Sequence, residues 1–285
     1  MVIPTLNAAS EIESLLNLLL VQKPSPREVL VVDSSSDDET AEIVRGFADR
    51  GVRLVVINRN EFDHGGTRRM AAAETSGDFI LMLTQDAVPV GTSYAEKLLL
   101  PFADPKVGAV CGRQLPKDDA RPFERLVRNF NYPEVSAIHS IEDVGHIGIK
   151  AFFLSDVCSA YRRSAYESCG GFPEHCNIYE DMYMAAQLIR SGWKVAYAAD
   201  AAVKHSHNLT PRQQFARNRE GGRFLEEHAA LLNCDSEVGE GTRLVRSVSR
   251  QLLKEGHVGE VFAFGVDCAA RLLGNRAGRR DARRV

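Results

Sequence analysis

Short apolar segments alternate with amphipathic segments along the first hundred residues. Four apolar runs are each long enough for one buried strand: 1–4, 28–32, 52–57 and 79–83. Between these runs, apolar side chains recur at helical spacing over 11–21, and 39–49 and 70–75 also fit helices. Strands and helices that alternate at this spacing predict a parallel sheet with right-handed crossovers and flanking helices.

The pattern is less regular beyond residue 90. We expect helices over 94–102, 182–190 and from 211 onward, and strands over 107–111, 151–154 and 193–197. Residues 117–150 show little periodicity, which is typical of an irregular binding segment. From about 240 the chain reads as helical and basic. We therefore divide it into a domain over 1–232 and a helical, basic extension over 233–285.

Composition excludes several classes of protein. A chain of 285 residues with 44% hydrophobic content can bury a substantial core, and its net charge of -3 argues against general affinity for nucleic acids. No GxGxxG follows the first strand and no GxxxxGK[ST] occurs, so a dinucleotide fingerprint and a P-loop are unsupported.

Three observations bear on the compartment. The six cysteines show no CxxC pairing or zinc-like spacing, so we expect reduced thiols in a cytoplasmic protein. Met1 leads straight into Val2, Ile3 and Pro4 without a basic or long apolar segment, and we expect no secretory signal. No run reaches the roughly 18 apolar residues that span a bilayer.

Carboxylates follow two of the expected strands. Asp33 ends the run over 28–32, and Asp86 comes shortly after the run over 79–83. In open α/β sheets the carboxyl ends of the strands are where ligands bind. Asp33 suits hydrogen bonds from a pyrimidine base or a ribose, and Asp86 suits a hard cation shared with a phosphate. Each also fits an ordinary cap of the segment that follows it.

Two further clusters have both a functional and a structural interpretation. Gly65 and Gly66, followed by Arg68 and Arg69, precede a helix. They are suited to binding an anion at the start of that helix, or else they form a turn with solvated arginines. The adjacent acids Glu180 and Asp181 open another helix, where they suit proton transfer, or else simply complement the helix dipole.

A pair of histidines follows the last expected strand. His205 and His207 are two residues apart, so in an extended segment both side chains lie on one face. Imidazoles suit manganese better than magnesium and can complete a metal site. The alternative is a surface histidine pair.

Several of these stretches, in this order and spacing, resemble the inverting family 2 glycosyltransferases. They are 4–7 (PTLN), 31–37 (VVDSSSD), 62–68 (FDHGGTR) and 84–87 (TQDA). The last two resemble the bacterial rhamnosyltransferase subgroup most, as does 112–116 (GRQLP). The resemblance implies a GT-A fold with a mixed, mostly parallel sheet. It also implies a nucleotide-diphosphate sugar donor and a divalent metal, Mg²⁺ or Mn²⁺.

The resemblance also implies roles for residues. Asp181 matches the general base, with Glu180 beside it. Asp86 matches the last position of the metal-binding DxD, whose first position is Thr84 here, so the metal depends more on other ligands, for which we favour His205. Residues assigned to the donor are Thr5, Asn7, Asp33, Ser35, Gly65, Gly66, Arg68, Gln85, Asp86 and Arg217. Arg217 is chosen because the QxxRW motif of other branches is absent. Asp156, Arg113 and Gln114 are assigned to the acceptor side.

On this resemblance, we expect transfer of L-rhamnose from dTDP-L-rhamnose, with inversion, to a saccharide or lipid-linked saccharide of a bacterial surface polysaccharide. The alternatives are a family 2 enzyme with a UDP-hexose donor, and a nucleotide-binding or nucleotidyl-transferring α/β protein. The basic C-terminal segment either contacts an anionic inner membrane from the cytoplasm or packs on the catalytic domain. We expect no nucleic-acid partner.

Overall fold

The computed structural model describes residues 1–233 and 240–284. Its internal contacts divide the chain into two compact units. The first comprises 1–114, 134–141 and 152–205, and the second comprises 115–133, 142–151 and 206–285. The second unit thus includes 206–232, which the sequence analysis grouped with the catalytic domain. The boundary at 232 stays a prediction.

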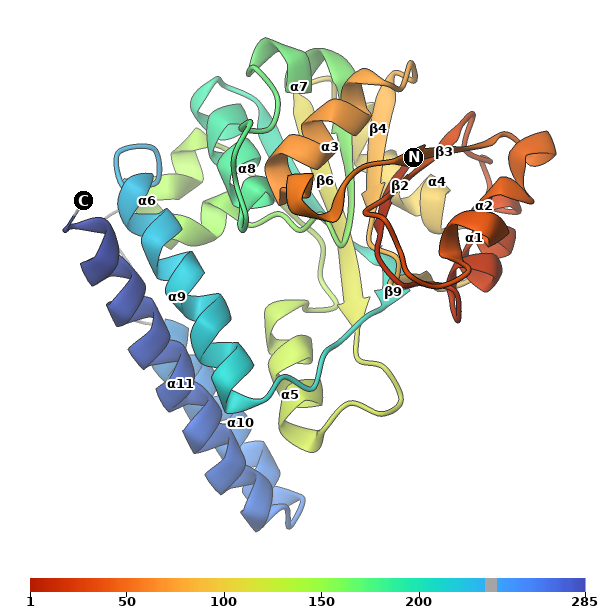
Figure 1. Cartoon of the computed structure of the whole chain (residues 1–285). Coiled ribbons are helices and arrows are strands. Elements are labelled where there is room, and N and C mark those ends of the chain that lie inside the picture. The colour runs from red at the N-terminus through yellow and green to blue at the C-terminus, as the bar shows by residue number, and fades with distance from the viewer. Residues whose placement is uncertain (234–239, 285) are drawn as a thin grey trace. The chain divides into compact units, whose positions relative to one another are not determined.

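A nine-stranded sheet organises the first unit (Figure 1). Its strands run in the order β3 (Val52–Val56), β2 (Val29–Asp33), β1 (Val2–Thr5), β4 (Phe79–Leu83), β8 (Cys158–Arg162), β6 (Val107–Leu115), β9 (Lys194–Lys204) and β5 (Val88–Pro89), and β7 (Ala137–His139) also pairs with β9. β1 is parallel to β2 and β4, and β2 is parallel to β3. β8 is antiparallel to β4 and β6. The expected mixed α/β sheet is confirmed.

Helices cover both faces of this sheet. They are α1 (Ile12–Leu20), α2 (Thr40–Arg45), α3 (His64–Ala73), α4 (Tyr94–Leu99), α7 (Arg163–Ser168) and α8 (Glu180–Arg190). The apolar stripe of α1 buries Ile12, Leu15, Leu16 and Leu19 in one core with Val29 and Val31 of β2. Successive side chains of a strand point to opposite faces, so Leu30 and Val32 face the other layer, where α3 contacts β1 and β2.

The sheet topology brings chemically useful positions to one edge. The parallel strands β1, β2 and β4 all end at this edge. Because β8 is antiparallel to β4, with Leu83 opposite Cys158, the segment that precedes β8 reaches the same edge. Asp33, the residues after Leu83 and the residues before Cys158 therefore lie along one border of the sheet.

The second unit is helical. It contains α5 (Pro122–Asn131), α6 (Val144–Ile147), α9 (Pro211–Glu227), α10 (Glu240–Lys254) and α11 (Val258–Ala282). Thr210 caps α9, and its hydroxyl accepts from the Gln213 backbone amide. α9 and α11 pack side by side (Figure 1), and a Cβ at Gly222, Gly274 or Gly278 would meet the backbone of the other helix.

Some expected elements were wrong. Residues 151–154 are not a strand, because a 3₁₀ turn over Gly148–Phe152 buries Phe152 in the interior. The strand is β8, a few residues later. The segment 117–150, read as irregular, contains α5 and β7. α3 begins at His64 rather than Met70, with Asp63 as its cap.

Two properties were assessed only for the residues that the structure describes. In 1–233 and 240–284, no helix is both long and apolar enough to cross a membrane. Five cysteines there are free thiols: Cys111, Cys158, Cys169, Cys176 and Cys268. Cys234 lies outside the described residues.

Candidate active site

Asp33, the residue proposed to bind the nucleotide base, is held rigidly at the end of β2. Its side chain is 1% exposed. Its Oδ1 accepts from Thr5 Oγ1 at 3.0 Å and from Ser36 Oγ at 2.6 Å, and Oδ2 accepts from Ser36 N at 2.9 Å. These bonds fix the carboxylate between the ends of β1 and β2. Thr5 thus supports Asp33 directly.

Two residues beside Asp33 have left-handed backbones. Asn7 has φ 51° and Ser35 has φ 55°, a conformation that residues other than glycine rarely adopt. The Asn7 amide donates to Ser36 Oγ at 2.8 Å, and the Ser35 hydroxyl donates to Ile57 O at 2.8 Å. The loops after β1 and β2 therefore bond to each other and to the chain that follows β3.

Gln85 joins this loop pair to β4. Its Oε1 accepts from Leu6 N at 2.8 Å, and its Nε2 donates to Leu6 O at 3.2 Å. The Gln85 amide group thus bonds to both backbone groups of Leu6, just after β1, in the pattern that a neighbouring strand would use. The structure places Gln85 as a brace between the Asp33 loops and Asp86.

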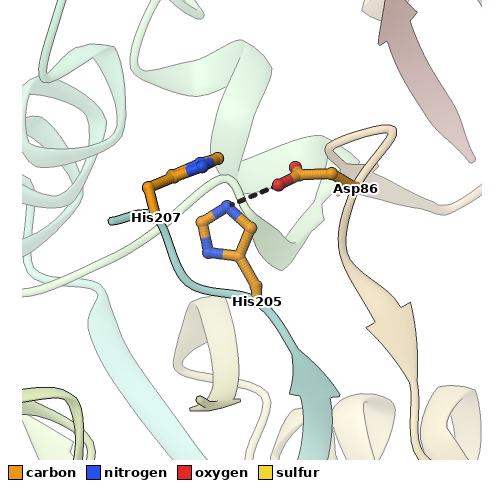
Figure 2. Close-up of side chains that lie close together, drawn as sticks. All are labelled: Asp86, His205 and His207. Atoms are coloured by element: carbon orange, nitrogen blue, oxygen red, sulfur yellow. Dashed lines mark ion pairs between the residues drawn. The ribbon is translucent and has the colours of Figure 1, made fainter. Parts of the chain in front are cut away.

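Asp86, His205 and His207 converge on one point (Figure 2). One ligand atom from each lies within 4.8 Å of the other two, and Asp86 Oδ2 is 3.4 Å from His205 Nε2. His205 is buried, Asp86 is half-buried and His207 is exposed. His207, three residues after the end of β9, joins the two residues predicted as metal ligands.

The second ring nitrogen of His205 is oriented by the interior. Nδ1 lies 2.9 Å from Gln114 Oε1, and Gln114 Nε2 donates to Ser155 Oγ at 2.9 Å. An amide oxygen only accepts, so the neutral imidazole carries its proton on Nδ1 and turns the lone pair of Nε2 toward Asp86. Metal-binding histidines are oriented in this way. A carboxylate and two imidazoles fit a divalent transition ion such as Mn²⁺.

A second group of charged side chains surrounds Arg68. Arg68 is 3% exposed, and its guanidinium lies 3.2 Å from Glu180 Oε1 and 3.9 Å from Asp156 Oδ2. Asp156 Oδ1 accepts from Ser159 Oγ at 2.5 Å and from Tyr161 OH at 2.7 Å. A single buried arginine is thus shared by two buried carboxylates.

Asp181, the expected general base, completes the group. Its Oδ2 accepts from Asp156 N at 3.2 Å, and its Oδ1 accepts from Met182 N at 2.7 Å. Tyr179, two residues earlier, has φ 64°, and so the chain turns sharply as it enters α8. A bulky residue in this conformation is strained, and such strain concentrates at functional sites.

The electrostatics of the group suit proton transfer. Burial, and then the neighbouring charges of Glu180 and Asp156, raise the pKa of Asp181 well above its usual range. Burial raises the pKa of Asp156 to about 6, against the opposing effect of Arg68. A carboxylate whose pKa is raised toward neutrality is a better proton acceptor at physiological pH.

The comparisons with known proteins agree with this geometry. Residues 1–170 match the protein family described as "Glycosyl transferase family 2". The chain belongs to this family. As a family 2 glycosyltransferase it acts on a nucleotide-sugar donor, as the sequence predicted.

Individual relatives extend the match. The chain is 42% identical over 259 residues to the O-antigen chain rhamnosyltransferase RfbN of Salmonella typhimurium, covering 89% of this chain and 81% of that protein. It is also 42% identical over 261 residues to the O-antigen chain rhamnosyltransferase WbaN of Salmonella anatum, with the same coverage of both chains.

Solved structures show the fold. The mannosyltransferase PcManGT from Pyrobaculum calidifontis, in complex with GDP-Man and Mn²⁺, has a TM-score of 0.66 at 18% identity, covering 98% of this chain and 86% of that one. S. aureus TarS 1–349, in complex with UDP, has a TM-score of 0.60 at 17% identity, covering 99% and 90%. The GT-A fold expected for this glycosyltransferase is confirmed.

The structure gives the glycine pair of this family 2 enzyme a packing role. A Cβ on Gly65 would come 2.7 Å from Pro173 O, and one on Gly66 would collide with Glu174 O. Gly65 N donates to Cys176 O at 2.9 Å, and Gly66 N donates to Asp63 Oδ1 at 2.7 Å. These amides are occupied by protein oxygens, and so the predicted contact of both glycines with the donor stays a prediction.

Three other predicted residues lie in contexts the sequence did not indicate. Arg68 faces carboxylates, as described, rather than an open phosphate site. Arg113 lies 3.0 Å from Glu134. Arg217 is exposed on α9 in the second unit. Their roles toward donor and acceptor stay predictions.

Sequence reasoning missed the link between the two halves of the site. Ser155 receives the Gln114 amide that orients His205, and the next residue, Asp156, holds Asp181. Thr84 N also donates to Val157 O at 3.2 Å. Ser159 and Tyr161 are two residues apart on β8 and so lie on one face, where both hydroxyls donate to Asp156 Oδ1.

Proposed function

We propose that this family 2 enzyme transfers L-rhamnose from dTDP-L-rhamnose, with inversion, to a saccharide of an O-antigen type polysaccharide. The observation that carries the sugar and the pathway class is the identity to two O-antigen chain rhamnosyltransferases over 89% of this chain. The observation that supports the chemistry is the pair of clusters, one suited to a cation and one to a base.

In the proposed reaction, Asp181 accepts the proton of the attacking acceptor hydroxyl. The acceptor oxygen forms a bond to the anomeric carbon while that carbon's bond to the diphosphate oxygen breaks, and dTDP leaves with the electron pair. Asp33 holds the nucleotide, and the Gln85 brace keeps its loop in register with Asp86. Asp86, His205 and His207 would hold a divalent cation, which supplies positive charge for the leaving diphosphate.

Complementation tests this proposal in the cell. The chain is expressed in a Salmonella typhimurium strain that lacks RfbN, and the O-antigen ladder is examined by gel electrophoresis. We expect the wild type to restore the ladder and Asp181→Asn to leave it absent at equal protein level. Glu167→Gln is the matched control, because that carboxylate is 61% exposed and pairs only loosely with Arg163 at 3.5 Å.

Purified protein tests the donor. Release of nucleotide diphosphate is measured with dTDP-L-rhamnose, UDP-galactose and UDP-N-acetylglucosamine, each with polyprenyl-diphosphate saccharides as acceptors and with Mn²⁺ or Mg²⁺. Turnover only with a UDP sugar refutes the rhamnose donor. Release of pyrophosphate from a nucleoside triphosphate, with no glycosidic product, refutes the transferase reaction itself.

We further propose that the second unit binds the cytoplasmic face of an anionic membrane. The exposed stripe of α11 is apolar over its first four turns: Val258, Phe262, Val266, Ala269, Leu272 and Leu273. Phe262 is 77% exposed and Val258 is 66% exposed. The same stripe continues with exposed Arg276 and Arg280. An apolar face bounded by cations suits the interface of an anionic bilayer.

Flotation with vesicles tests this contact. We expect binding to phosphatidylglycerol-containing vesicles, little binding to phosphatidylcholine alone, and loss of binding in Phe262→Asp and Arg276→Glu. Arg45→Glu, an exposed charge reversal on α2 in the first unit, is the control and should bind normally. Equal flotation of all variants, or a dimer that Phe262→Asp dissociates, would contradict the membrane proposal.

A further inference from the structure

Arg68 and Asp156 form a buried charge pair next to Asp181, the proposed base. Asp156 Oδ2 and Arg68 Nε are both buried, lie 3.9 Å apart and have no hydrogen-bond partner among the described residues. The other Asp156 oxygen is taken by two hydroxyls of β8, and its backbone amide holds Asp181. The Asp156 side chain is therefore fixed toward Arg68.

The charges around this pair do not balance. Asp156, Glu180 and Asp181 carry up to three negative charges, and Arg68 supplies one positive charge to all of them. Other titratable groups that interact with these residues are His64 on α3, Tyr161 on β8, Tyr166 on α7, Cys111 on β6 and Cys176 in the loop before α8. A buried site with an excess of carboxylates binds protons more readily than the separate groups would.

We infer that Arg68 and Asp156 are positioning residues that set, in opposite directions, the pH above which Asp181 can accept a proton. This inference rests on the proposed role of Asp181 as the base. Arg68 stabilises its anion, whereas the carboxylate of Asp156 disfavours that anion. Neither side chain needs to touch donor or acceptor for this purpose, and so the inference differs from the donor and acceptor roles that the sequence suggested for them.

The pH profile of kcat/KM with dTDP-L-rhamnose and acceptor tests the inference. Asp156→Asn keeps the shape of the side chain and removes its charge, so the acidic limb should move about one unit toward lower pH. Arg68→Gln removes the opposing charge, so the limb should move about one unit or more toward higher pH. Arg68→Lys keeps a charge and should shift the limb less. Glu167→Gln should leave the profile in place.

The outcomes separate this inference from the proposed function. If Asp181→Asn retains full turnover, Asp181 is not the base and the proposed mechanism fails first. If Asp181→Asn is inactive while Asp156→Asn lowers kcat equally at every pH, Asp156 is merely structural and the inference fails alone. If Arg68→Gln does not fold, Asp156→Asn decides the matter by itself.

Discussion

Replacing Asp156 with asparagine should change how the stability of the first unit depends on pH. Its pKa in the folded protein is raised from 3.8 to about 6, mainly by burial. The folded state therefore binds the proton more tightly than the unfolded state. The stabilisation that this proton provides is complete below about pH 4 and is lost as the pH rises through about 6.

The magnitude follows from the size of this shift. One pKa unit corresponds to about 1.4 kcal/mol. A shift of about two units therefore makes the wild type about 3 kcal/mol less stable at pH 8 than it would be if Asp156 kept its ordinary pKa in the folded protein. Asparagine does not titrate. The stability of Asp156→Asn relative to the wild type should therefore increase by about 3 kcal/mol between about pH 4 and pH 8.

Guanidinium unfolding followed by tryptophan fluorescence measures this difference. The chain has a single tryptophan, Trp193, which comes directly before β9 and packs against Gly108 in the first unit, so its signal reports that unit. Taking the difference between the two proteins cancels the titrating groups that do not interact with Asp156. A difference in unfolding free energy that stays constant across the pH range would refute the reasoning. Glu167→Gln should show no such slope.

Three further predictions address the metal, the helices and the nucleotide. In calorimetric titration with MnCl₂, His205→Ala should show little binding. Gln114→Leu, which removes the hydrogen-bond partner of His205 Nδ1, should bind about 10- to 100-fold more weakly than the wild type. If both variants bind Mn²⁺ as tightly as the wild type, the proposed metal site is excluded. Gly278→Ala should cost about 1–3 kcal/mol in thermal unfolding by steric conflict with α9, whereas Gly265→Ala, with open space around it, should be neutral or stabilising. Asp33→Ala should weaken dTDP binding in the same calorimeter, and unchanged affinity would argue against its contact with the base.

The strand ends were predictable from sequence because their signal is local. Asp33 directly follows an apolar run, and the parallel topology then determines which edge it reaches. Asp86 was placed by the same logic, and the spacing of His205 and His207 placed both on one face.

The remaining site depends on contacts distant in sequence. Arg68 was read as a phosphate ligand because its local context, glycines at a helix start, is typical of anion sites. Its partners, Asp156 and Glu180, come about a hundred residues later, and no periodicity connects them. The apolar run over 151–154 was read as a strand because a buried turn needs apolar side chains as much as a strand does.

The turn of Ser155 and Asp156 supports both ends of the proposed reaction at once. Ser155 bonds to the glutamine that orients His205, the proposed cation ligand, and the Asp156 amide bonds to Asp181, the proposed base. A single-residue insertion or deletion here would displace the leaving-group side and the acceptor side together. Engineers who seek new acceptors should therefore leave this dipeptide intact and vary loops that carry only one of the two functions.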